Sequence, residues 1–226
     1  MRELEENSRQ KEILPYSKRR NEMLLKVCPS LRDKVLKALL GFRTILGNDL
    51  TDYQKLCLLY QMLCEGGTYD YGDRKKSLSY SYLGALKGLA VRAGFADLFT
   101  ILVGECTDRY VPYRISGYIA DDIKLIEAND TGHAWVIIKD KTSNKAWHFD
   151  PTWDLGKKQY RYFAKTDNEM KGRIWATKYL PVCAEKLSGR IYSNKARLTR
   201  LVDYYKSMPQ RFESGDFTTN EKEEIL

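Results

Sequence analysis

The chain has 226 residues, of which 43% are hydrophobic, 12% aromatic and 30% charged, and its formal net charge is +8 at pH 7. This is the composition of a globular protein long enough to bury a core of its own. It excludes collagen-like, low-complexity and wholly disordered proteins.

The N-terminal segment predicts neither a secretory signal nor a membrane anchor. Its first twenty residues, MRELEENSRQKEILPYSKRR, include ten charges and lack the apolar stretch of a signal peptide. No apolar run in the chain approaches the roughly 20 residues of a membrane-spanning helix. Five cysteines without Cys-x-x-Cys spacing argue against a disulfide framework and against a zinc cluster. We therefore expect a charged arm over residues 1–20 and a cytoplasmic protein, with secretion from a longer precursor left open.

Two helices are predicted in the first third of the chain. Apolar side chains recur at helical spacing from Ser30 to Leu40, and Gly41 is expected to end that segment. A stronger helix is expected from Thr51 to Cys64, because its apolar residues follow a three- and four-residue spacing. The two segments together predict a helical N-terminal layer.

The stretch SLSYSYLGALKGLAVRAG, residues 77–94, predicts a central buried helix. Its larger apolar residues form one stripe, and the glycines and alanines between them permit the close approach of a neighbouring backbone. Gly94 is expected to end the helix.

Beyond Gly94 the pattern favours strands. The runs FTILVGE, VPYRISGYIA, HAWVIIKD and KAWHFD are rich in β-branched and aromatic residues, and DKTSN predicts a hairpin connection between the last two. A last, basic helix is expected near 193–208. Helices followed by strands predict one α+β domain over 21–212, with N-terminal helices packed on an antiparallel sheet, and a flexible tail over 213–226.

Both histidines of the chain lie in the strand-rich part. His133 begins the strand HAWVIIKD, and Asp150 follows KAWHF. If these two strands pair in antiparallel register, His133 and Asp150 fall at the same open end of the hairpin. A carboxylate there can hold one imidazole nitrogen and orient the ring as a general base. His148, in the second strand, is expected to have a structural role.

Three separate segments resemble the transglutaminase-like, papain-like superfamily. Its members carry a nucleophilic cysteine at the start of a helix, in patterns such as G-V-C-x-G-Y-A, and later a strand with H-A-W and a D-x-T-W motif. Here SLSYSYL resembles the first element, GHAW the second and WHFDPTWD the third. The resemblance covers about residues 50–185 and implies the papain/transglutaminase-like core of that superfamily.

The resemblance aligns Ser79 with the nucleophilic cysteine when residues are counted back from Gly94. A serine hydroxyl is a far weaker acid than a thiol, whose pKa is near 8.5, so an exchange of cysteine for serine costs a cysteine-type site most of its activity. Three explanations stay open: an engineered replacement that silences the enzyme, a natural pseudoenzyme, and a working serine variant.

The resemblance implies acyl chemistry on a glutamine side chain or a peptide amide, by hydrolysis or by transfer to an amine. Ser79 is then the nucleophile, His133 the base and Asp150 its orienting carboxylate. Tyr71, Trp135 and Trp153 are the candidate substrate contacts. No metal or organic cofactor is implied, and the partner is a peptide or protein.

Two other functions remain open from the sequence. The first is a pseudoenzyme that binds a peptide or protein in the same cleft without turnover. The second is an anionic-surface or nucleic-acid binder that acts through the segment Lys171–Arg211, which contains ten basic residues and two acidic ones. No ordered nucleic-acid-binding motif accompanies that segment.

Overall fold

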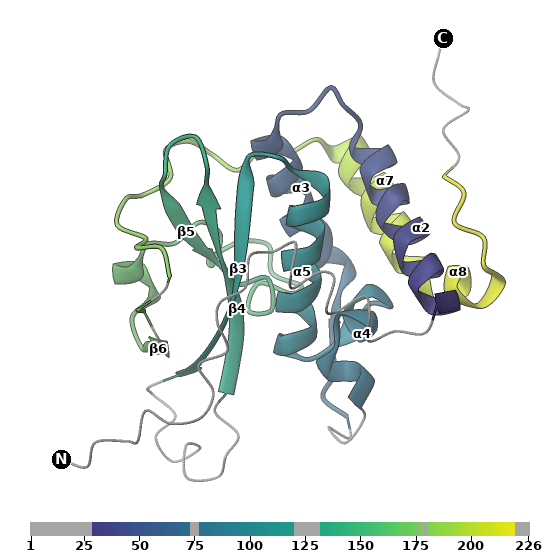
Figure 1. The fold of residues 1–226 in the computed structure, drawn as a ribbon, viewed down its shortest axis with the longest axis horizontal. Helices are drawn as coiled ribbons and strands as arrows, with labels where there is room; N and C mark the ends of the chain where they lie inside the picture. The colour runs from purple at the N-terminus through teal and green to yellow at the C-terminus, as the bar shows by residue number, and fades with distance from the viewer. Residues whose placement is uncertain (1–28, 73–76, 120–131, 176, 179, 220–226) are drawn as a thin grey trace.

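The computed structural model describes residues 29–72, 77–119, 132–175, 177–178 and 180–219 (Figure 1). The expected arm over 1–20 lies outside these residues. The fold is a mixed one, in which a layer of helices packs against one antiparallel sheet. None of the helices described is both long and apolar enough to cross a membrane.

Helices α2 (Pro29–Leu46) and α3 (Asp52–Gly66) form where the sequence predicts them. A capping box fixes the start of α3: the Thr51 side chain accepts from the backbone N–H of Gln54, and the Gln54 side chain accepts from that of Thr51. Gly41 does not end α2, contrary to expectation. It lies within the helix, and the position needs a glycine because a β-carbon there would stand 1.9 Å from the hydroxyl of Tyr204, which packs against this turn.

The predicted helix over 77–94 is wrong. Its segment forms a 3-10 turn η1 (Ser77–Tyr80), a one-turn helix α4 (Tyr82–Leu86) and a two-residue strand β2 (Leu89–Ala90). Strand β2 pairs in parallel with β1 (Thr68–Tyr69). The long central helix is α5 (Arg92–Cys106), so it begins almost where the predicted helix was expected to stop.

FTILVGE is accordingly helical rather than extended, because it forms the second half of α5. Ten of the 15 residues of α5 are buried. Such an all-round apolar segment lacks the one-sided spacing that distinguishes a helix from a buried strand.

The main sheet has four strands in the order β5-β4-β3-β6, and every neighbouring pair is antiparallel. Their bounds are β3 (Tyr110–Ile119), β4 (Gly132–Asp140), β5 (Ala146–Phe149) and β6 (Arg173–Trp175). Strands β4 and β5 form the predicted hairpin, in which Lys139 lies opposite Ala146 and Val136 opposite Phe149. The open end of this hairpin therefore carries His133 and Asp150.

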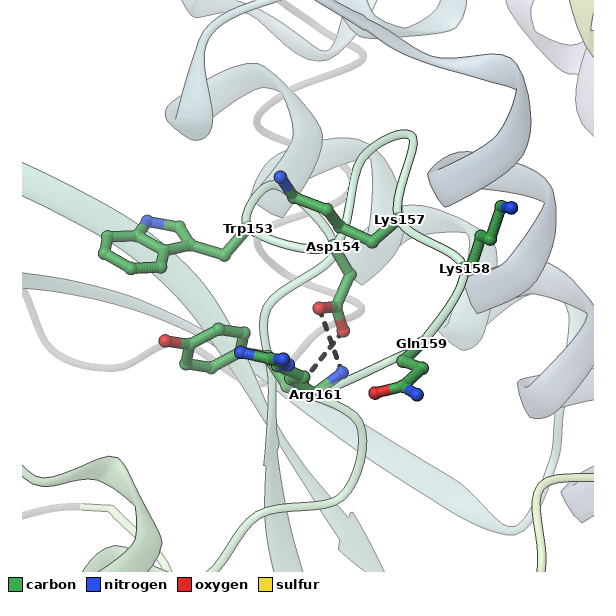
Figure 2. A pocket seen from close by; sticks show the side chains of 7 residues that line it. Trp153, Asp154, Lys157, Lys158, Gln159 and Arg161 are labelled. Atoms are coloured by element: carbon green, nitrogen blue, oxygen red, sulfur yellow. Dashed lines mark hydrogen bonds between the residues drawn. The ribbon is translucent and has the colours of Figure 1, made fainter.

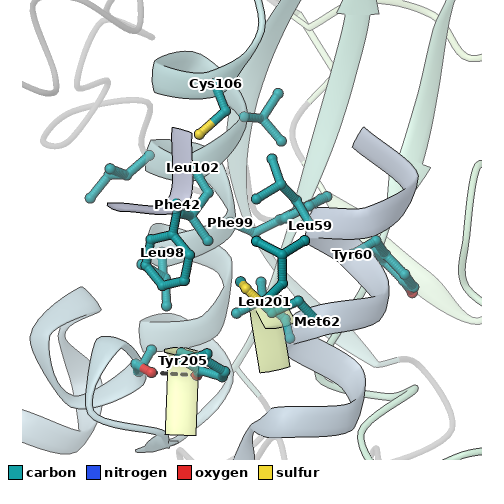
Figure 3. Packing of buried hydrophobic residues seen from close by; sticks show 14 of the residues in the cluster. Phe42, Leu59, Tyr60, Met62, Leu98, Phe99, Leu102, Cys106, Leu201 and Tyr205 are labelled. Atoms are coloured by element: carbon teal, nitrogen blue, oxygen red, sulfur yellow. Dashed lines mark hydrogen bonds between the residues drawn. The ribbon is translucent and has the colours of Figure 1, made fainter. Parts of the chain in front are cut away.

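Side-chain alternation along β4 divides the interior into two clusters. Ala134, Val136 and Ile138 belong to the larger cluster, shared with the helices, whereas Trp135 and Ile137 belong to a smaller one on the other face of the sheet. The larger cluster joins α2, α3, α5 and α7 (Lys195–Lys206), and Figure 3 shows Phe42, Leu59, Phe99 and Leu201 from these four helices converging in it.

The folded domain extends further toward the C-terminus than the sequence predicts. Helix α7 matches the predicted basic helix, and α8 (Met208–Ser214) follows it. Phe217 is only 8% exposed and lies edge-on to Phe212, with their ring centroids 5.3 Å apart. The chain through Phe217 thus packs on the domain instead of starting a flexible tail at residue 213.

Candidate functional site

Ser79 lies in the turn η1 and is 4% exposed. Its hydroxyl donates a hydrogen bond to the carboxylate of Asp70, and its carbonyl accepts one from the backbone N–H of Val91, at 2.9 Å. Among the residues described, no hydrogen bond joins Ser79 to His133. The predicted placement of Ser79 at the start of the central helix is therefore wrong, because α5 begins thirteen positions later. The hydroxyl of Ser79 is instead held by an aspartate.

Arg92 is the first residue of α5. It lines a cavity of about 320 Å³ at the end of the sheet, whose wall consists of Tyr80, Arg92, Ala93, Arg114, Ser116, Gly117, Tyr118, Gly132, His133 and Ala134. Its guanidinium donates to the hydroxyl of Tyr69 at 3.5 Å, and a β-carbon on Gly132 would lie 4.0 Å from it. The start of the central helix thus presents an arginine to the cavity.

The segment Arg92-Ala93-Gly94-Phe95-Ala96 also fits the pattern C-x-G-Y-A, with arginine at the cysteine position and phenylalanine at the tyrosine position. The sequence hides this match because Gly94 is typical of the end of a helix, whereas in the structure it lies within the first turn of α5.

His133 and Asp150 meet at the open end of the hairpin. Nε2 of His133 lies 2.6 Å from Oδ2 of Asp150, and both side chains are almost fully buried. Arg173, on β6, forms an ion pair with the same carboxylate oxygen. Burial by itself raises the pKa of Asp150, but His133 and Arg173 together hold it below the ordinary value. Asp150 is therefore a carboxylate shared between two partners.

Arg173 was not identified from the sequence. Its guanidinium carbon lies over the rings of Tyr162, Trp153 and Trp135, at 4.6, 4.9 and 5.4 Å from their centroids. No local motif indicates this, since Arg173 reaches Asp150 only through the pairing of β6 with β3.

Three residues are predicted as substrate contacts, and for Trp135 this prediction is wrong. Its side chain is fully buried and its indole N–H donates to Nδ1 of His148 at 2.9 Å. Trp153 is 41% exposed, and its ring centroid lies 5.9 Å from that of His133. Tyr71 is 88% exposed and packs against Tyr69. Of these two tryptophans, Trp153 is thus the exposed one, and its ring lies beside that of His133.

His148 belongs to a second polar cluster, on the Trp135 side of the sheet. Its Nε2 lies 2.8 Å from a carboxylate oxygen of Asp167, whose other oxygen accepts from the backbone N–H of Cys183 at 3.0 Å. Burial lowers the pKa of His148. Because Nδ1 accepts from the indole N–H of Trp135, Nε2 is the nitrogen that carries the proton and donates it to Asp167.

The side chains of His148, Asp167 and Cys183 have potential ligand atoms within 4.8 Å of one another, close enough to hold a metal ion. A metal on Nε2 of a neutral His148 would require the ring proton on Nδ1, where the indole N–H of Trp135 already points. The hydrogen-bond pattern therefore fits a structural network better than a metal centre.

The described cysteines offer no alternative nucleophile. Cys57, Cys64, Cys106 and Cys183 are free and buried. Burial raises the pKa of all four thiols, to about 11 for Cys57 and about 12 for Cys106. A thiol that reacts at neutral pH has a lowered pKa.

Comparisons with known proteins leave the family unassigned. No family model and no curated protein matches the chain. The chain is similar to two solved structures of Legionella pneumophila LapG, calcium-bound and EGTA-treated, at 9% and 10% identity. These matches cover 84% and 85% of this chain and 98% of each LapG chain, with TM-scores of 0.39 and 0.37. Scores at this level establish neither a shared fold nor a shared activity.

Proposed function

We propose that this protein is a non-catalytic, transglutaminase-like binding module that holds a peptide or protein segment in the cavity at the start of α5. The observation that carries the proposal is Arg92 in the place that the G-V-C-x-G-Y-A pattern gives to a cysteine. A guanidinium has no nucleophilic lone pair at neutral pH, since its pKa exceeds 12. An acyl-enzyme cannot form at this position.

The surroundings of Ser79 and His133 support the same conclusion. A serine attacks only when a base removes its proton, and the acceptor next to Ser79 is Asp70 rather than an imidazole. The side chain of His133 lies on the same face of the sheet as that of Trp135 and stacks on it with an interplanar angle of 22°. Helix α5 packs on the opposite face. His133, Asp150 and Arg173 then act as a buried scaffold for the cavity wall.

The test is an amine-incorporation and ammonia-release assay with a glutamine-containing peptide, run on the natural chain and on Ser79→Ala. We expect both proteins to stay at the background rate, because neither holds an activated nucleophile. Glutamine turnover by the natural chain that disappears in Ser79→Ala would overturn the proposal. It would restore Ser79 as the nucleophile of an acyl-transfer enzyme.

A further inference from the structure

Two arginines, Arg92 and Arg114, line the cavity at the start of α5, and none of the described residues that line it is acidic. Arg114 forms an ion pair with Asp97, with Nε and the carboxylate oxygen 3.3 Å apart, so its charge is balanced. Arg92 is therefore the lining residue to which we assign the contact with an anion. The hydroxyls of Tyr80, Ser116 and Tyr118 add neutral hydrogen-bonding groups. The chemistry of this wall suits an anion of carboxylate size, which an arginine can bind through two parallel hydrogen bonds.

A second cavity, of about 540 Å³, lies in the loop that follows β5 (Figure 2). Lys157, Lys158 and Arg161 line it and are exposed. Its single acidic lining residue, Asp154, is occupied: it accepts from the hydroxyl of Tyr60 at 2.6 Å and from two backbone N–H groups of the loop. Three basic side chains therefore line this cavity, and among its described lining residues no acidic side chain is available to neutralise them.

Trp153 lies close to both cavities. It lines the second one, and its ring lies 5.9 Å from His133, which lines the first. Arg173 supports its inner face, with the guanidinium carbon 4.9 Å from the ring centroid. Because Trp153 is 41% exposed, it offers an apolar surface between two basic regions.

We propose that the two cavities form one groove for an acidic peptide. One carboxylate of the peptide binds Arg92 in the first cavity, a second binds the basic side chains of the other cavity, and the chain between them packs on Trp153. This ligand class rests on the proposed non-catalytic function. The separation of the cations by an uncharged aromatic stretch favours two spaced carboxylates over the evenly spaced phosphates of a nucleic acid.

The test uses fluorescence anisotropy with a labelled peptide that has two glutamates and an amidated end. A matched peptide has glutamine at both positions, and a third carries the same glutamines with a free C-terminal carboxylate. We expect the glutamine peptide to bind at least about ten-fold more weakly than the glutamate peptide, since each charge-assisted hydrogen bond is worth a factor of this order. Rescue by the free C-terminus would identify the chain end as one source of the carboxylate.

Two variants place the binding site. Arg92→Gln and the pair Lys157→Gln with Lys158→Gln are each expected to weaken glutamate-peptide binding about ten-fold, while leaving the glutamine peptide unchanged. Arg200→Gln, on the exposed side of α7, is the matched control for the loss of one positive charge and is expected to have no effect. Urea unfolding of each variant checks that it is folded.

Equal affinity for the glutamate and glutamine peptides would overturn the proposal even if no variant could be purified. Equal weakening by Arg200→Gln would overturn it too, because it would indicate a general charge effect. Tighter binding of an oligothymidylate than of the peptide would favour the nucleic-acid alternative instead. These outcomes are independent of the amine-incorporation assay, so failure of the ligand class can be told apart from failure of the non-catalytic function.

Discussion

Replacing Asp150 with alanine is expected to lower the free energy of unfolding by about 3–5 kcal/mol. The carboxylate is fully buried and compensates the charge of Arg173, whose side chain is only 4% exposed. Its removal leaves a guanidinium in the interior without its anion and leaves Nε2 of His133 without its partner. The measurement is equilibrium unfolding in urea at pH 7.

Asp203→Ala is the matched control. Asp203 is an exposed carboxylate on α7, and its loss is expected to change the stability by less than about 0.5 kcal/mol. Combining Asp150→Ala with Arg173→Met should cost less than the sum of the two single changes, because the second substitution removes the uncompensated cation. A loss from Asp150→Ala no larger than that from Asp203→Ala would show that the buried ion pair does not form.

The pH dependence of stability provides a further readout of the same residue. The pKa of Asp150 is lower in the folded chain than in the unfolded one, so the unfolded state binds a proton first as the pH falls. The stabilisation by Asp150 is therefore complete above about pH 4 and is lost below it. The natural chain should lose stability below pH 4 more steeply than Asp150→Ala.

Gly94→Val is expected to destabilise the protein by about 3 kcal/mol, the upper part of the usual range for overpacking. A β-carbon on Gly94 would lie 2.6 Å from the carbonyl oxygen of Ser81, 2.8 Å from the β-carbon of Ala90 and 3.1 Å from the carbonyl oxygen of Ser79. Backbone atoms make two of these three contacts and cannot rotate away, so α5 must separate from the η1 turn.

Gly132→Ala is the control for Gly94→Val. Its β-carbon would meet the guanidinium of Arg92 at 4.0 Å, an ordinary contact, and a change below about 0.5 kcal/mol is expected in urea unfolding. If Gly94→Val proved as mild as Gly132→Ala, the close crossing of α5 and η1 would be wrong.

The sequence predicts best the elements that are specified locally. The capping box at Thr51, the one-sided apolar spacing of α3 and the hairpin across DKTSN depend on neighbouring residues, and all three are present. Between 77 and 106 the sequence misleads, because Gly84 and Gly88 look like the small residues of a closely packed helix and Gly94 looks like its end. Gly94 instead lies inside α5, where the carbonyls of Ser79 and Ser81 pass close to it.

The candidate site likewise contains one part that the sequence predicts and one part that depends on the tertiary structure. The contact between His133 and Asp150 follows from strand parity and hairpin register, which the sequence carries. The roles of Arg92 and Arg173 depend on where α5 begins and on the pairing of β6 with β3. The local pattern around Arg92 is outweighed by Gly94, which looks like the end of a helix, and no local pattern indicates the role of Arg173.

We propose that residue 92, and not residue 79, holds the position of a nucleophile at the start of the central helix. Arg92→Cys and Ser79→Cys, alkylated with iodoacetamide across a range of pH and read by peptide mass spectrometry, test it directly. A thiol at 92 lies at the N-terminus of a 15-residue helix and shares a cavity with Arg114, both of which lower its pKa. A thiol at 79 lies beside the carboxylate of Asp70, which raises it.

We predict half-maximal alkylation below about pH 7.5 for Arg92→Cys and above about pH 8.5 for Ser79→Cys. The opposite order, with the lower midpoint at residue 79, would show that residue 79 and not residue 92 holds the activated position.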